Sequence, residues 1–202
     1  MRQALVIFGF LVVLGGTSAV ADVAPTAEAV EEMVLGNADA PVTLTEYSSM
    51  TCSHCADFHT NVLPTIKKEY IDTGKVRLVS RDFPLDGLAL AASMVARCSG
   101  QKRYFGLVEV MFRTQDNWAQ SRNPKAGLVS LARFAGMSAK DVDVCLENED
   151  LLKAVQEGAR KGREEFKVDS TPTFFVDGEK VSGAMPVDDF RKVLDAAVAK
   201  KQ

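Results

Sequence analysis

The feature that most constrains this chain is a pair of cysteines at the junction of a predicted strand and a predicted helix. Residues 42–47 read VTLTEY and alternate with period two, which predicts a strand. A turn follows, and residues 52–70 predict a helix that Pro64 interrupts, because proline removes a backbone hydrogen bond. The helix opens with Cys52-Ser53-His54-Cys55. A Cys-x-x-Cys pair in this context is typical of a redox-active disulfide.

The position of Cys52 predicts a reactive sulfur. At a helix N-terminus, free backbone N–H groups and the positive end of the helix dipole stabilise a thiolate. His54 can add a hydrogen bond or a positive charge beside it. A stabilised thiolate makes the disulfide easier to reduce, so the oxidised protein becomes a stronger oxidant. Cys55, one turn further along, is expected to be more buried and less reactive.

Other uses of the cysteine pair are less well supported. A metal site could combine Cys52 and Cys55 with His54 or His59, but the chain has only two histidines and lacks a natural fourth ligand. Covalent haem attachment requires a histidine directly after the second cysteine, and Ala56 stands there. A purely structural disulfide remains an alternative. We therefore expect neither a metal nor a cofactor.

The order of predicted elements changes twice along the chain. A second strand at residues 75–83 completes a β-α-β unit, and the next eighty residues show helical periodicity of apolar side chains. Asp177-Gly178 between two short strands predicts a hairpin, and Pro186 precedes an amphipathic helix. The layout is β-α-β, a helical insertion, then β-β-α, with no linker for two independent domains.

The first 21 residues indicate export. Arg2 precedes an apolar run, and Ala19-Val20-Ala21 has the small-x-small pattern of a signal-peptidase site. The run is short for a membrane span, although an uncleaved anchor remains the alternative. We expect a mature chain that begins near Asp22 in a compartment where disulfides persist. Twenty-four Lys and Arg against 27 Asp and Glu, with no basic block, argue against nucleic acid as a partner.

Two further groups of residues, outside the Cys52–Cys55 pair, carry structural information. Cys98 and Cys145 each fall on the apolar face of a predicted insertion helix, and in an oxidising compartment we expect them to be bonded. Closing that loop contributes about 4 kcal/mol in the chain-entropy account. Two separate buried thiols are the alternative. Thr171-Pro172 precedes an apolar strand, and its place between the β-α-β unit and the hairpin favours a cis peptide bond.

These elements resemble the thioredoxin fold. The insertion, the export signal and the stretch VLGNADAPVTLTEYSSMTCSHCADFH further resemble the DsbA family of periplasmic thiol:disulfide oxidoreductases, over essentially the whole mature chain. The resemblance implies an α/β thioredoxin fold with an all-helical domain inserted between the β-α-β and β-β-α halves. The expected boundaries are a signal peptide at 1–21, thioredoxin-like halves at 22–86 and 167–202, and the insertion at 87–166.

The resemblance also assigns roles to residues. Cys52 matches the nucleophilic cysteine, Cys55 the resolving one, and His54 the histidine that stabilises the Cys52 thiolate. Pro172 matches the cis-proline beside the disulfide, and the backbone of Thr171 is expected to pair with substrate peptide.

A buried acid is implied as well. Glu46 matches an acidic residue that assists proton transfer at the second cysteine; a partly exposed strand glutamate is the alternative. The sequence departs from the best-known members at two positions that touch the disulfide or the peptide: Ser53 replaces proline, and Thr171 replaces a frequent valine. Both bear on oxidising strength and partner preference.

We therefore expect a protein disulfide oxidoreductase that oxidises reduced, unfolded exported polypeptides in the periplasm. The resemblance implies reoxidation by a quinone-linked membrane oxidase of the DsbB type. An isomerase or reductase of the same fold is the main alternative, and a metal-binding or chaperone-like module is a weaker one. Known isomerases of this type carry a dimerisation segment, whereas only about 20 mature residues precede the first predicted strand. We accordingly expect a monomer.

Overall fold

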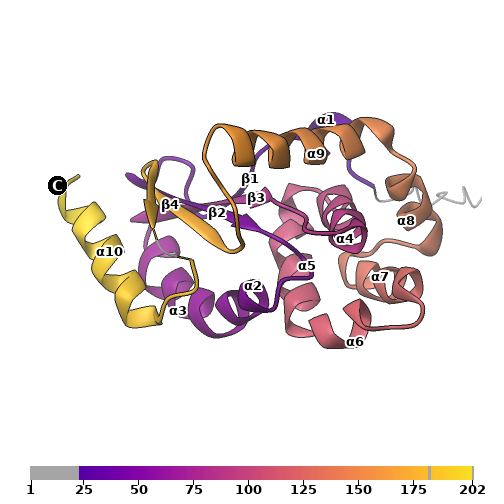
Figure 1. The fold of residues 1–202 in the computed structure, drawn as a ribbon, viewed down its shortest axis with the longest axis horizontal. Coiled ribbons are helices and arrows are strands. Elements are labelled where there is room, and N and C mark those ends of the chain that lie inside the picture. Colours follow the sequence, from indigo (N-terminus) through magenta and orange to yellow (C-terminus); the bar gives the residue numbers. More distant parts are fainter. Residues whose placement is uncertain (1–22, 182, 202) are drawn as a thin grey trace, which may run out of the picture.

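A mixed five-stranded sheet forms the centre of one half of the molecule, in the order β1-β3-β2-β4-β5 (Figure 1). The structure is a computed structural model that describes residues 23–181 and 183–201, so the predicted signal peptide lies outside the described residues. β2 and β3 are parallel, and the other neighbouring pairs are antiparallel. The strands are β1 (Met33–Leu35), β2 (Val42–Ser48), β3 (Val76–Asp82), β4 (Thr173–Val176) and β5 (Glu179–Val181).

The helix that follows β2 runs through its proline. It comprises α2 (Ser53–Asp57), the π-helical turn η1 (Phe58–Val62), α3 (Leu63–Ile66) and a second π-helical turn, η2 (Lys67–Ile71). The sequence predicts a helix interrupted at Pro64, and the structure shows this interruption as a change of helix type: regular α-helix gives way to the π-helical η1 directly before Pro64, while the chain stays helical. Proline lacks an N–H, and its ring collides with the carbonyl one turn earlier in a regular α-helix. The wider turn of η1, directly before Pro64, accommodates both constraints.

This helix and α10 (Val187–Ala199) cover one face of the sheet (Figure 1). The core between them is aromatic: Phe58 lies 4.6 Å from Phe174, and Phe174 lies 4.9 Å from Phe190, measured between ring centroids. Leu44 of β2 is fully buried in the same cluster. Because side chains alternate along a strand, the residues of β2 that share a face with Leu44 also point toward these helices.

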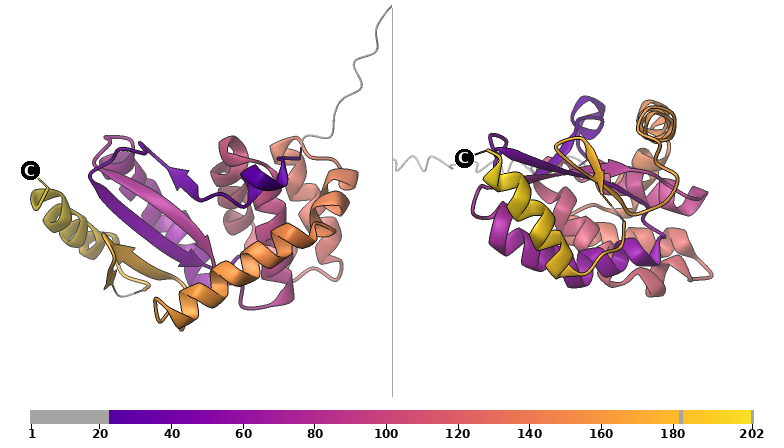
Figure 2. Two further views of the ribbon diagram at one scale, coloured as in Figure 1. Left: turned by 90° about the horizontal axis from the view of Figure 1, so that it is seen from above. Right: turned by 60° about the vertical axis from the view of Figure 1, so that its left-hand side comes forward.

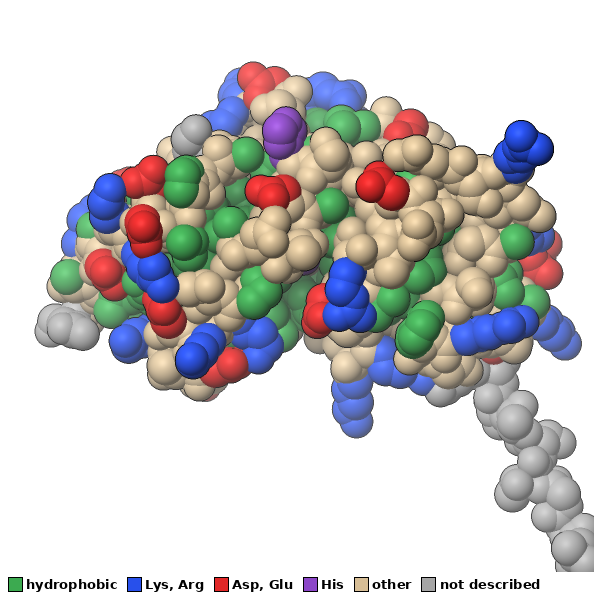
Figure 3. Space-filling model, turned by 90° about the horizontal axis from the view of Figure 1, so that it is seen from below, with side chains coloured by type: hydrophobic (Ala, Val, Ile, Leu, Met, Phe, Trp, Pro, Cys, Tyr) green, Lys and Arg blue, Asp and Glu red, His purple; other side chains and the backbone are tan. Residues whose placement is uncertain are grey.

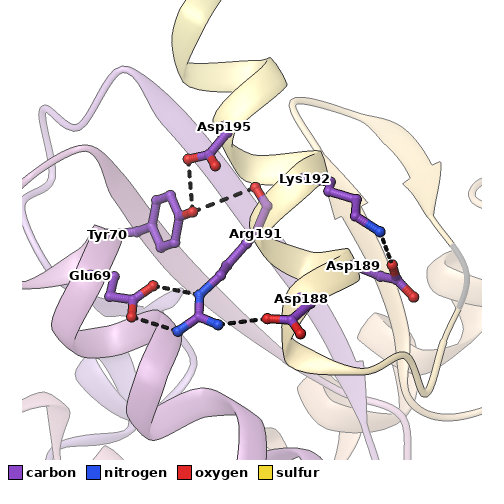
Figure 4. Close-up of polar contacts among 7 residues, drawn as sticks. All are labelled: Glu69, Tyr70, Asp188, Asp189, Arg191, Lys192 and Asp195. Atoms are coloured by element: carbon purple, nitrogen blue, oxygen red, sulfur yellow. Dashed lines mark hydrogen bonds and ion pairs between the residues drawn. The ribbon is translucent and has the colours of Figure 1, made fainter.

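Polar contacts fasten α10 to η2 at the edge of that core (Figure 4). The guanidinium of Arg191 donates to both carboxylate oxygens of Glu69, at 2.7 and 2.8 Å, and also to Asp188. The hydroxyl of Tyr70 donates to Asp195 at 2.8 Å. Burial and this hydrogen bond raise the pKa of Tyr70 to about 12. The bidentate geometry makes Arg191 the main polar link between the two elements.

The predicted helical insertion is present beside the sheet, and the core around which it packs also includes Met33, Met50 and Cys55 from outside the insertion (Figure 1). Cys98 and Cys145 are joined by a disulfide, with their Cα atoms 6.1 Å apart, so the end of α4 is fixed to α8. The elements of this part are α4 (Gly87–Cys98), α5 (Gln101–Arg113), α6 (Gln115–Ala119), α7 (Pro124–Ala132), the 3-10 turn η3 (Arg133–Ala135), α8 (Ala139–Leu146) and α9 (Glu149–Glu164).

The long helix α9 returns the chain from the insertion to the sheet (Figure 2). It packs against the face opposite α10, where Tyr47, Phe83 and Phe175 form a small buried cluster. Gly162 allows α9 to lie close to Tyr47 of the sheet, because a Cβ atom at this position would lie 2.7 Å from Cε1 of Tyr47. No helix in the described part of the chain has the length and apolar character that a membrane span needs.

One strand was not predicted. The sequence places the first strand at residues 42–47, but the structure adds α1 (Thr26–Ala29) and β1 before it, so that expectation is wrong. β1 has only three residues and no long alternation to reveal it. Tertiary contacts hold this segment: Arg97 of α4 donates to the carbonyl oxygens of Ala29 and Glu31, at 3.0 and 2.9 Å, and forms a buried ion pair with Asp82.

Candidate active site

Cys52 occupies the N-cap position of α2, directly after the turn that ends β2. Its side chain is buried, and its thiol donates a hydrogen bond to the carbonyl oxygen of Thr171 at 3.2 Å. The peptide bond between Thr171 and Pro172 is cis, in agreement with the preference drawn from the sequence. The two cysteines of the pair are present as free thiols, so the structure represents the dithiol state. Residues more than a hundred positions apart thus meet at one sulfur atom.

The surroundings of Cys52 favour its thiolate. They lower the pKa of Cys52 to about 5, chiefly because the thiol of Cys55 can donate to it. Burial acts in the opposite direction, and the hydroxyl of Thr171 then adds a second donor. The backbone N–H groups of Cys55 and His54 add smaller contributions, as expected for an acceptor at a helix N-terminus. At neutral pH, Cys52 is therefore largely ionised in the dithiol state.

Cys55 has the opposite character. It is fully buried, and burial is the largest of the causes that raise its pKa well above the usual range of a thiol. The hydrogen bond to Cys52 and the negative charge of Glu46 act in the same direction. Cys52 is thus held as a thiolate, which suits a nucleophile. Cys55 is held as a thiol, so it must take up a proton when it acts as the leaving group.

His54 contributes a backbone N–H to the surroundings of Cys52. Its side chain is exposed, and its backbone N–H is one of the donors that lower the pKa of Cys52. The expectation for the imidazole itself stays a prediction.

Glu46 is fully buried, which removes the alternative of a partly exposed strand residue. The alternation of β2 puts Glu46 on the face of Leu44, against the helix that carries the cysteines. Both of its carboxylate oxygens lie next to Nε2 of His59, at 3.0 and 3.1 Å. The ring of His59 stacks on Phe112 with centroids 4.3 Å apart. Sequence reasoning considered His59 only as a metal ligand; its spacing of four from Cys55 on a helix was the signal that could have found it.

Gln115 is a site residue that the sequence does not reveal. It lies in α6 of the insertion, is buried, and donates from Nε2 to the carbonyl oxygens of Met50 and Cys52, at 2.9 and 3.0 Å. No motif surrounds it, and only the packing of α6 against the turn brings it to Cys52. The insertion therefore supplies part of the framework around the reactive cysteine.

The surface beside the cysteine turn is hollowed and mixed in charge. A hollow of about 280 Å³ lies between the start of α2 and the junction of α5 and α6, with Ser53, Phe112 and Gln115 in its wall. Figure 3 shows one face of the molecule, on which acidic and basic side chains are interspersed. Within residues 23–181 and 183–201, no group of three or more His, Cys, Asp or Glu side chains is arranged to hold a metal ion.

Comparison with known proteins agrees with this geometry. A family model described as "Thioredoxin" matches residues 28–196. The crystal structure of Wolbachia pipientis alpha-DsbA1 superposes with a TM-score of 0.79 and 28% identity, over 85% of this chain and 92% of that one.

Sequence relatives give the same picture. A "Putative protein-disulfide oxidoreductase" of Rickettsia bellii is 30% identical over 168 residues, which make up 83% of this chain and 64% of the relative. The chain thus spans less than two thirds of that rickettsial protein. A "Probable disulfide bond formation protein D" of Bacillus anthracis is 27% identical over 174 residues, with 82% and 78% covered. The family match, the sheet order and the cysteine site together show that the chain belongs to the thioredoxin family, on its DsbA-like branch.

Proposed function

We propose that this chain is a thiol-disulfide oxidoreductase that introduces disulfide bonds into exported proteins by exchange at the Cys52–Cys55 disulfide. The observation that carries the proposal is the asymmetry of the two sulfurs: the pKa of Cys52 is lowered to about 5, and the pKa of Cys55 is raised. A stabilised Cys52 thiolate favours the dithiol state of the protein. The disulfide state consequently takes electrons readily from other thiols.

The exchange proceeds in two steps. A substrate thiolate attacks Sγ of Cys52; the Cys52–Cys55 bond breaks, a Cys52–substrate disulfide forms, and Cys55 leaves and takes up a proton. A second substrate thiolate then attacks the substrate sulfur of this mixed disulfide, and the Cys52 thiolate leaves. The substrate loses two electrons and gains a disulfide, and the protein gains them as a dithiol. The low pKa of Cys52 makes it a good leaving group in the second step.

The substrates in this proposal are reduced, unfolded polypeptides of the periplasm, reached after removal of a signal peptide. The cis-proline loop supports such a substrate, because the backbone of Thr171 lies beside the reacting sulfur, with its carbonyl oxygen 3.2 Å from Sγ of Cys52. The dithiol protein must afterwards lose two electrons. We assign that step to a quinone-linked membrane oxidase of the DsbB type, and we take the working form of the protein to be a monomer.

A redox titration against glutathione, combined with a thiolate titration of Cys52, tests the function. We expect a reduction potential above about −200 mV, closer to the strongly oxidising members than to thioredoxin at about −270 mV. A Cys52→Ser variant should lose the thiolate signal that titrates near pH 5. A potential near −270 mV together with a Cys52 pKa near 8.5 would overturn the oxidase proposal and favour a reductase of the same fold.

A further inference from the structure

We propose that the hollow beside α2 is a subsite for the substrate polypeptide, which takes a basic side chain close to the reacting cysteine of that substrate. Asp116 meets the positive charge, and Oε1 of Gln115 accepts a hydrogen bond from the same group. The inference rests on the proposed exchange at Cys52–Cys55. It adds a residue preference that the exchange itself does not require.

The hollow begins at the residue that follows Cys52. Ser53 and Ala56 form its wall on the side of α2, and the junction of α5 and α6 forms the opposite wall. Figure 1 shows α2 and α6 on the same, lower side of the molecule. In the mixed disulfide, the substrate cysteine is bonded to Cys52, and an extended chain advances about 3.3 Å with each residue. A side chain one or two positions from the substrate cysteine therefore reaches the hollow.

The size and the lining of the hollow suit one polar side chain. Its volume is about 280 Å³. Pockets for small-molecule ligands measure about 300–1,000 Å³ and are lined mainly by apolar groups. In this hollow, Ala56 and Phe112 are the apolar members of the wall, and the other six residues are polar or charged. The occupant that fits is a polar side chain of a polypeptide already bonded to Cys52.

Gln115 supplies an acceptor in a fixed position. Its side chain is 7% exposed, and Nε2 donates to the carbonyl oxygens of Met50 and Cys52. Because both partners are acceptors, the amide cannot be turned over, and Oε1 is held in one place. Oε1 accepts no hydrogen bond from residues 23–181 and 183–201, and it is not fully buried, so it can be reached from the hollow. An acceptor left free in this way indicates an occupant that carries an N–H group.

The charges of the wall favour a cation. The charge of Arg113 is compensated by Glu109, at 3.1 Å. Asp116 accepts a hydrogen bond from the neutral amide of Gln120, also at 3.1 Å, and forms no ion pair within the part of the chain that the structure describes. Asp116 is therefore the uncompensated charge of the hollow. A substrate Lys or Arg neutralises this charge and also supplies the N–H group.

A panel of short peptides tests the subsite. Each peptide has one cysteine and carries Lys, Gln, Met or Glu at one of the two positions before or after it. The rate constant for reduction of the protein disulfide is divided by that for reduction of the uncharged 2-hydroxyethyl disulfide, because a neighbouring charge changes the reactivity of the peptide thiol itself. At one of these positions, we expect the corrected rates to fall in the order Lys, Gln, Met, Glu. The Lys peptide should react about two- to fivefold faster than the Met peptide.

One variant and a matched control assign this preference to the hollow. Asp116→Asn removes the charge and keeps an acceptor for Gln120, so Lys and Gln peptides should react equally, and both faster than Met because Gln115 is unchanged. Asp39→Asn removes the same charge from an exposed residue before β2. The cysteines follow the other end of that strand, about 20 Å away. This control should keep the preference of the unchanged protein.

The outcomes separate the subsite from the exchange. If the Lys peptide reacts no faster than the Met peptide at any of the four positions, the inference is overturned although exchange proceeds. If Asp39→Asn abolishes the preference as Asp116→Asn does, the preference comes from the overall field of the protein, and the inference is also overturned. If the disulfide form reacts with none of the peptides, the proposed function fails instead.

A spectroscopic measurement covers the case in which Asp116→Asn does not fold. In a Cys55→Ser chain, each peptide stays bonded to Cys52 because the resolving thiol is absent. We expect the amide resonances of Thr114 and Asn117, which belong to the wall of the hollow, to shift more with the Lys peptide than with the Met peptide. The resonance of Asp39 should not move. Equal shifts of Thr114 and Asn117 with both peptides would contradict the inference.

Discussion

The side-chain amide of Gln115 donates a hydrogen bond to the backbone carbonyl of Cys52 at 3.0 Å. The same nitrogen donates to the carbonyl of Met50 at 2.9 Å, and the Cys52 carbonyl also accepts from the N–H of Ala56. Gln115 of the helical insertion thereby links the turn before α2 to the Cys52 carbonyl, which accepts the first backbone hydrogen bond of α2. The conformation of the reactive turn depends on a part of the chain that lies outside the thioredoxin halves.

We expect Gln115→Met to destabilise the protein by about 1–3 kcal/mol, because a side chain of similar length leaves a buried carbonyl without its donor. The free energy of unfolding from urea titrations measures the loss. Gln120→Met is the matched control: Gln120 is exposed, five residues further along, and its substitution should change stability by less than about 0.5 kcal/mol. Equal effects of the two variants would show that the hydrogen bonds of Gln115 contribute nothing.

Thr171→Val should raise the pKa of Cys52. The Thr171 hydroxyl oxygen is buried and finds no partner among the described residues while Cys52 is a thiol, and it is a donor that stabilises the Cys52 thiolate. Valine has nearly the same shape without the donor. A rise of about one pH unit corresponds to about 1.4 kcal/mol, and the reduction potential should fall by about 30 mV.

Absorbance of the thiolate during a pH titration gives the first value, and glutathione equilibria give the second. Thr173→Val provides a control on the same loop, since the Thr173 hydroxyl bonds to the Ser170 carbonyl rather than to Cys52. It should affect stability and leave the Cys52 pKa unchanged. If Thr171→Val also leaves that pKa unchanged, the hydroxyl is not a donor to the thiolate.

The dithiol form should gain stability relative to the disulfide form as pH rises from about 5 to about 9. Cys52 has a pKa of about 5 when folded and an ordinary value of 9.0, so over this window the unfolded chain binds more protons than the folded one. Stability rises with pH wherever that holds, and the gain is lost as pH falls through 5. Above pH 9 the raised pKa of Cys55 reverses the trend, since the unfolded chain then ionises while the folded thiol does not.

Guanidinium denaturation of both forms at pH 4, 6 and 8 measures this difference. The disulfide form has no titrating cysteine in the pair and serves as the internal reference. In a Cys52→Ser chain, in which Cys55 is the one remaining thiol of the pair, the dependence of stability on pH between 5 and 9 should disappear. Parallel pH dependences of the dithiol and disulfide forms would contradict the low Cys52 pKa.

Local sequence patterns predicted the elements whose signals are local. The alternation of residues 42–47 gave β2, Asp177-Gly178 gave the hairpin of β4 and β5, and the cysteine pair opened α2 as expected. These signals work because side-chain period and turn geometry are properties of a few consecutive residues. The order of β-α-β unit, helical insertion and β-β-α unit was predicted from the same local patterns of side chains and turn residues.

Features that depend on tertiary contact escaped the sequence. β1 has three residues and forms because β3 offers it an edge. The helix continues past Pro64 because a π-helical turn accommodates the ring, a local adjustment that no propensity indicates. His59 and Gln115 look ordinary in the sequence, and only the packing of β2, α5 and α6 around the cysteine helix gives them polar partners.

Two glycines of α9 should respond oppositely to alanine. A Cβ atom at Gly162 would lie 2.7 and 3.1 Å from ring carbons of Tyr47, whereas at Gly158 it would meet nothing within 4 Å. Gly158→Ala should therefore stabilise the protein by up to about 1 kcal/mol, because alanine favours the helix. Gly162→Ala gains the same helix preference but forces α9 away from Tyr47, and overpacking of this kind costs about 1–3 kcal/mol.

Urea denaturation of the two single variants measures the change in the free energy of unfolding that each substitution causes. The contrast isolates the contact with the sheet, because the two positions share a helix and differ in what faces them. Near-ultraviolet circular dichroism should also change for Gly162→Ala alone, since Tyr47 packs against Phe175 with ring centroids 5.8 Å apart. Equal stabilisation by both substitutions would mean that α9 does not approach the sheet at Gly162. The close approach of α9 to the sheet over Tyr47 would then have to be abandoned.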